Sequence, residues 1–147
     1  KGLDQLLKAL KSSAIPKIEI GVLGEKDSRE DGGSNATIGA AHEFGTSTMV
    51  RRSFLRVPLE TKLNKELKNS GLSDKDTLKA VIASGTVIPW LEKVALSAEA
   101  VVLDAFDNSG PGWAAWKNKN YENNTGMILT DTQQLRDSIG TRVKEAP

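Results

Sequence analysis

The sequence predicts an α+β fold in which a small, mainly antiparallel β-sheet packs against one long α-helix, with additional short helices and long loops. Residues 17–22 and 138–143 alternate apolar and polar side chains at the period of a strand. From Leu91 to Phe106 apolar residues keep helical spacing, within a helix of roughly six turns or about 33 Å. A lone terminal strand must pair, so we expect the two strands to pair with each other in a single domain of residues 1–147.

The first half of the chain predicts two short helices separated by a strand and a loop. Leucines at helical spacing predict an amphipathic helix over 2–11. The segment of about 24–34 mixes charges with glycine and serine, which indicates a mobile loop. Asn35 is expected to cap a helix over 36–44, whose small residues imply a closely approaching neighbour, and Gly45 to end it as a left-handed cap.

The second half is dominated by further helices. Pro58 suits the first turn of a helix with leucines every four residues, which closes at Gly71. Ser73 and Asp76 resemble a capping box that opens the next helix, and Thr86 is expected to cap the long one.

A tryptophan-containing loop follows the long helix over about 108–127, where glycine and asparagine break any period. Asp131 or Thr132 then caps a short helix through Leu135, which leads into the terminal strand.

Composition restricts the classes of function. The formal net charge of +1 gives no bulk attraction for nucleic acid or anionic lipid. The absence of cysteine excludes disulfides, thiolate metal sites and cysteine nucleophiles. No apolar run approaches the roughly 18 residues that span a bilayer, so no membrane partner is expected.

His42 and Glu43 are adjacent and invite a metal or acid–base interpretation. A zinc-protease helix needs a second histidine four residues after the first, and Thr46 stands there. We therefore expect a structural histidine, no metal, no cofactor and no enzymatic activity. A hydrolase that uses His42 and Glu43 stays as an alternative, which unchanged activity in His42→Ala would exclude, and the many carboxylates leave a two-carboxylate glycosidase open.

Arg51, Arg52 and Arg56 form a cluster of basic residues. They suit phosphate or the carboxylates of a partner, and equally a solvated basic patch at the start of a helix.

Trp113 and Trp116 lie close to two lysines. This pattern can stack on single-stranded nucleic acid, but it also suits core anchoring or a protein interface. A nucleic-acid-binding module that uses this loop and the three arginines is the alternative function.

Three stretches together resemble a known family. AAHEFGT (40–46), RRSFLR (51–56) and MILTDTQQLRDSI (127–139) are similar to the signature segments of the tail-completion and neck proteins of tailed bacteriophages. Val50 and Ser53 depart from that pattern where the family often has prolines, and Gln133 where it has glycine. We therefore expect a less rigid turn before Phe54, and Gln133 permits a helical continuation where that family turns.

The resemblance implies structural and interface roles, not catalytic ones, for the matching residues. These are Glu43, Phe44, Gly45, Arg52, Phe54, Leu55 and Arg56. We place His42, Arg51, Trp113, Trp116, Asp131, Leu135 and Ser138 in the same candidate interface.

The resemblance further implies a virion protein at the head–tail junction, assembled in the host cytoplasm. It would complete or terminate the tail as a homo-oligomeric ring, a hexamer or dodecamer. Its partners would be the portal, connector or head-completion protein and the tail tube protein, with DNA possible in the lumen. Tail terminator, tail completion and head-side adaptor are not separated by the sequence.

Overall fold

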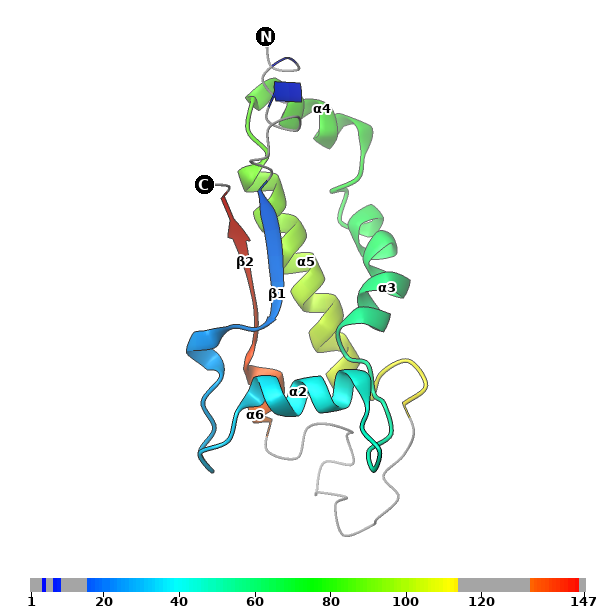
Figure 1. The fold of residues 1–147 in the computed structure, drawn as a ribbon. Helices are drawn as coiled ribbons and strands as arrows, with labels where there is room; N and C mark the ends of the chain where they lie inside the picture. Colours follow the sequence, from blue (N-terminus) through cyan, green and yellow to red (C-terminus); the bar gives the residue numbers. More distant parts are fainter. Residues whose placement is uncertain (1–3, 5–6, 9–15, 114–132, 146–147) are drawn as a thin grey trace.

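The computed structural model describes residues 4, 7–8, 16–113 and 133–145, and it has the predicted α+β fold (Figure 1). In chain order the elements are β1 (Lys17–Val22), the 3-10 helix η1 (Gly24–Lys26), α2 (Asn35–Phe44), α3 (Arg56–Asn69), α4 (Lys75–Ser84), α5 (Ile88–Asp107), α6 (Gln134–Asp137) and β2 (Ile139–Lys144). None of the described helices is long and apolar enough to cross a membrane.

The predicted pairing of the two strands is confirmed. β1 and β2 are antiparallel and in register from Lys17 opposite Lys144 to Val22 opposite Ile139. Directly opposed residues share a face, so the alternating apolar side chains of both strands lie together. That face packs on α5, where Thr141 Oγ1 donates a hydrogen bond to Glu99 Oε2 at 2.8 Å.

The long helix α5 organises the core. It contacts both strands and also α3, and α3 lies on the side away from β2 in Figure 1. Its seven buried residues follow the helical spacing that predicted it: Val94, Ala95, Ala98, Val101, Val102, Ala105 and Phe106. Two of them join side chains from distant segments in the core cluster, which consists of Phe54, Val102, Phe106, Leu135 and Ile139.

The predicted cap of α2 is wrong by one residue. Ser34 is the N-cap, and its Oγ accepts from Thr37 N at 3.0 Å. Asn35 is instead the first helical residue, and its side chain is buried. The side-chain amide donates to the carbonyl oxygen of Lys26 and accepts from Arg29, so its polar groups are satisfied.

The predicted caps of α4 and α5 also differ from the structure. Asp74 precedes α4 without a side-chain cap, so Ser73 and Asp76 form no capping box. Val87 holds the cap position of α5, although Thr86 Oγ1 accepts from Ile88 N at 3.4 Å. Gly71 does have the positive φ, of 70°, that was expected after α3.

The loop over 24–34 contains local structure. It includes η1 and an antiparallel bridge between Ser28 and Ser34. Asp27 links it to α2, because its Oδ1 accepts from Ser34 Oγ at 2.8 Å and from Ala36 N at 2.7 Å. The mobility of this loop stays a prediction.

Several predictions fall outside the described residues. Within the helix expected over 2–11, the structure describes Asp4, Leu7 and Lys8, all helical. Trp116 and Asp131 also lie outside the described residues.

The cap predicted at Asp131 or Thr132 is wrong, because Gln133 holds the N-cap position of α6. Gln133 has a positive φ of 57°, so the chain turns there and no helix continues through it, although the pattern that the sequence resembles has glycine at this position.

Candidate functional site

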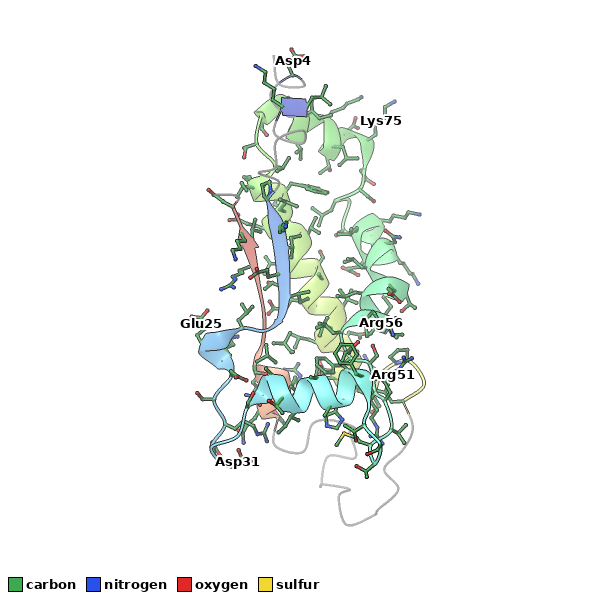
Figure 2. All side chains as sticks on the ribbon, viewed as in Figure 1. Asp4, Glu25, Asp31, Arg51, Arg56 and Lys75 are labelled. Carbon is green, nitrogen blue, oxygen red and sulfur yellow. The ribbon has the colours of Figure 1, made fainter. Side chains whose placement is uncertain are left out.

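The first two signature stretches meet where α2 turns into α3. We call residues 42–45 and 51–56 the α2–α3 joint. Arg52 N donates to the carbonyl oxygen of His42 at 2.8 Å, which closes the turn against the end of α2. Figure 2 labels Arg51 and Arg56 at the end of α3 that adjoins α2.

Glu43 connects the two helices through its carboxylate. The side chain is buried and accepts three hydrogen bonds, from Ser53 Oγ at 2.7 Å, Leu55 N at 3.0 Å and Arg56 N at 3.1 Å. The first N–H groups of a helix have no intrahelical acceptor and carry partial positive charge, so a carboxylate there is stabilising. Glu43 therefore caps α3 from the preceding helix.

Ser53 extends this cap. Its Oγ donates to Glu43 and accepts from Val57 N at 3.0 Å, which satisfies a further N–H of the first turn of α3. The serine hydroxyl is thus a structural part of the joint, at a position where the neck-protein pattern that the sequence resembles often has proline.

Gly45 ends α2 with a backbone that only glycine readily adopts. Its φ is 76° and its ψ is 170°, so the positive φ is confirmed but the left-handed helical conformation is not. A Cβ atom at this position would lie 3.2 Å from both Arg51 N and Met49 O. The turn therefore needs glycine for conformation and for space.

An aromatic cluster packs beneath the joint. Phe54 is buried, with its ring centroid 5.1 Å from that of Phe106. Trp113 meets Phe106 edge to face at 6.1 Å and donates from Nε1 to the carbonyl oxygen of Ser53 at 3.2 Å. Leu55 packs against the same core. Trp113 thus serves as a core anchor.

The third signature stretch reaches the same place. Leu135 is buried, and a Cβ atom on Gly39 of α2 would lie 3.3 Å from both Leu135 Cδ1 and Phe54 Cζ. Ser138 is also buried and donates from Oγ to the carbonyl oxygen of Leu135 at 2.6 Å. The close approach expected at the small residues of α2 is therefore made at Gly39, by Phe54 of the second stretch and Leu135 of the third.

The three arginines do not form one basic patch. Arg51 is exposed, and exposed Arg56 lies 3.9 Å from Glu60 one turn further along α3. Arg52 is only 3% exposed, and burial lowers its pKa. Two of the three side chains are therefore accessible to a partner or to phosphate.

His42 and Glu43 are placed as structural groups. Burial, with a contribution from the charge of Arg52, lowers the pKa of His42 to about 4, so the imidazole is neutral at pH 7. The Glu43 carboxylate is engaged by its three donors. Within the described part of the chain no group of three or more histidine, aspartate or glutamate side chains is arranged to hold a metal ion.

Phe44 is exposed, whereas the two residues before it, His42 and Glu43, are buried. The helical spacing places it with Ile38 and Ala41 on one side of α2, yet its side chain is 73% exposed. It is thus an apolar signature residue that a partner can reach.

Two grooves lie away from the joint. One of about 500 Å³ separates α3 from α5 and is lined by Lys62, Lys65, Glu66, Asn69 and Asp104. Lys62 Nζ donates to Asp104 Oδ2 at 2.6 Å and holds the pKa of that carboxyl below its usual range. The other, of about 240 Å³, lies between α4 and the start of α5, beside Trp90.

The sequence reasoning missed Ser53 and Asp27 as structural residues. Ser34 was also missed as the cap of α2, although serine is among the residues preferred at an N-cap and so carried a usable signal. Asp27 had none, because its acceptors serve groups that only the folded loop brings near.

Comparisons with protein-family models, with curated proteins and with solved structures found no match to this chain.

Proposed function

We propose that this chain is a structural virion protein of a tailed bacteriophage. It sits at the head–tail junction, completes or terminates the tail, and joins it to the head connector as a homo-oligomeric ring. In this role it has no catalytic site and no cofactor, and it contacts the tail tube and the portal, connector or head-completion protein.

The α2–α3 joint is the observation that carries this proposal. The first two stretches that resemble neck proteins are close in the chain and are joined by the hydrogen bonds of Glu43. The third stretch is distant in the chain, yet its Leu135 lies with Phe54 of the second against Gly39, the residue before the first. A chance similarity of separate segments would not require them to share one packing unit. The buried polar side chains of Glu43 and Ser53 hydrogen-bond within this unit.

The accessible residues of the joint suit a protein partner. Phe44, the last residue of α2, offers exposed apolar area. Arg51 and Arg56 offer positive charge where α3 begins (Figure 2). Aromatic and arginine side chains contribute a large share of binding energy at protein interfaces. These side chains are therefore the ones through which the ring would contact another layer of the neck.

The decisive experiment measures mass by light scattering coupled to gel filtration, across protein concentration, with and without purified tail tubes or connectors. We expect a ring, formed either alone or on one of these partners. Phe44→Ala should weaken partner binding while Leu96→Ala, a matched control that is 65% exposed on α5, leaves it unchanged. A concentration-independent monomer that binds neither partner contradicts the proposal.

The same preparation tests the alternative of a nucleic-acid-binding module. Phosphate contacts make affinity fall steeply with salt. Binding of a single-stranded oligonucleotide that weakens in this way, by a protein that ignores tail tubes and connectors, would favour the alternative.

A further inference from the structure

The two-stranded sheet presents two backbone edges. In an antiparallel pair, alternate residues of each strand direct N–H and C=O groups away from the partner strand. Within the described part of the chain, no backbone hydrogen bond joins 17–22 or 139–144 to another segment. A side-chain contact, from Lys26 Nζ to the carbonyl oxygen of Ile139 at 3.3 Å, reaches the start of β2. The remainder of β2 lies at the side of the molecule opposite α3 (Figure 1).

The outer face of this sheet differs in charge between its strands. β1 carries Glu19 there, with Lys17 at its end, whereas β2 carries Arg142 and Lys144. Within one copy, Glu19 accepts from Arg142 Nε at 2.5 Å and lies 3.6 Å from Lys144 Nζ. The Arg142 and Lys144 side chains are still 54% and 63% exposed, so both can meet a further carboxylate.

We propose that a second copy of this chain pairs its β1 with the outer edge of β2, in antiparallel orientation. The sheet then continues from copy to copy in the order β1–β2–β1–β2, and each Glu19 lies between two basic strands. This inference rests on the proposed ring only for its closure, and it names the surface that builds the ring.

The charges favour this head-to-tail arrangement over a two-fold one. Pairing β2 with β2 of another copy would bring Arg142 and Lys144 against their own counterparts, and like charges opposite each other destabilise a strand pair. Pairing β1 with β1 would leave both β2 edges open. A head-to-tail interface that closes into a ring leaves no open edge in any copy.

The absence of cysteine in the chain permits a direct cross-linking test. Glu19→Cys and Arg142→Cys chains, distinguished by a mass tag, are mixed under mild oxidation at concentrations that include those where light scattering detects assembly, with and without tail tubes. We expect the mixed disulfide dimer in severalfold excess over either homodimer. Lys68→Cys, on the exposed side of α3, is the control partner and should not cross-link with Glu19→Cys above background.

A charge-reversal series provides a second measurement. Arg142→Glu with Lys144→Glu should reduce assembly severalfold, and adding Glu19→Lys should restore it, because both the internal and the intermolecular pairs are then reversed. Circular dichroism and thermal unfolding check that each variant folds.

The outcomes separate this inference from the proposed function. Homodimers of Arg142→Cys in excess, or a ring that forms without cross-links between the strands, overturn the edge pairing and leave the neck function standing. A chain that stays monomeric with tail tubes and connectors present, and gives no cross-link, overturns both.

Discussion

Glu43 ties two helices together with one side chain. Glu43→Gln keeps the shape but replaces one acceptor oxygen with an NH₂ group that faces N–H and O–H donors. We expect the free energy of unfolding to fall by about 1–3 kcal/mol. Urea denaturation measures this, with Glu60→Gln as the exposed control, for which a change within about 0.5 kcal/mol is expected. Equal effects of the two variants would contradict the cap.

Phe54 and Phe44 provide a matched pair in the same signature. Phe54 is 4% exposed within the core cluster, and Phe44 is 73% exposed. Phe54→Ala should cost about 3–5 kcal/mol of unfolding free energy, because it leaves a cavity against Phe106. Phe44→Ala should change stability little, and a large loss there would show that Phe44 is needed for the fold rather than for a partner.

His42 makes stability depend on pH. Its pKa is about 4 in the folded chain and 6.5 ordinarily, because burial and the charge of Arg52 disfavour the protonated ring. Between these values the unfolded chain binds more protons, so this contribution is complete above pH 6.5 and is lost as pH falls towards 4.

The size of the contribution is at most about 3 kcal/mol, the free-energy equivalent of the shift. We expect denaturation curves between pH 7 and about pH 4.5 to show a shallower loss of stability in His42→Gln than in the wild type. Identical slopes in the two proteins would show that the histidine does not titrate in this way.

At the scale of elements, Gly45 is the residue at which α2 ends and the following turn begins. Gly45→Ala forces a side chain into a backbone region that costs on the order of 1–3 kcal/mol and against Met49 O and Arg51 N. Gly24→Ala is the control, because its φ is not positive and a Cβ there meets nothing within 4 Å. Thermal unfolding should separate the two variants. Gly45→Val should be worse still, since a β-branched residue is more strained at positive φ.

The elements themselves were predictable from local pattern. α5 and the two strands have long, regular apolar periods, so their type and their mutual pairing followed from the sequence. The caps did not follow. Asp74 and Val87 hold the cap positions, each one residue after the expected Ser73 and Thr86, and neither makes a side-chain cap hydrogen bond. A helix without a capping side chain carries no local sequence signal for the residue at which it begins.

At the scale of the whole molecule, the sheet joins segments near opposite ends of the chain. β2 contributes Ile139 to the core cluster and covers α5 beside β1. A chain truncated after Ser138 should therefore lose cooperative unfolding, since Val102 and Phe106 are uncovered and β1 has no partner. A chain truncated after Lys144 is the control and should unfold cooperatively in urea. Cooperative unfolding of the shorter chain would contradict this account of the core.

The return of the C-terminal segment to α2 also assembles the candidate site. Gly39, Phe54 and Leu135 come together only when the end of the chain folds back on α2. The sequence indicated which stretches belonged to the site, through their resemblance to neck proteins. It did not indicate that Arg52 is buried while Arg51 and Arg56 are exposed, because neighbouring positions in a turn have no periodic pattern of burial.

The sequence by itself determined the α+β class, the long helix, the paired strands and the positive φ at Gly45 and Gly71, since each depends on local periodicity or on the conformational freedom of one residue. The tertiary structure alone decided the roles of single side chains. Glu43 became a cap of α3, Trp113 a core anchor and Phe44 an exposed contact. The physical reason is that such roles depend on donors, rings and solvent brought near by distant segments, which no local pattern records.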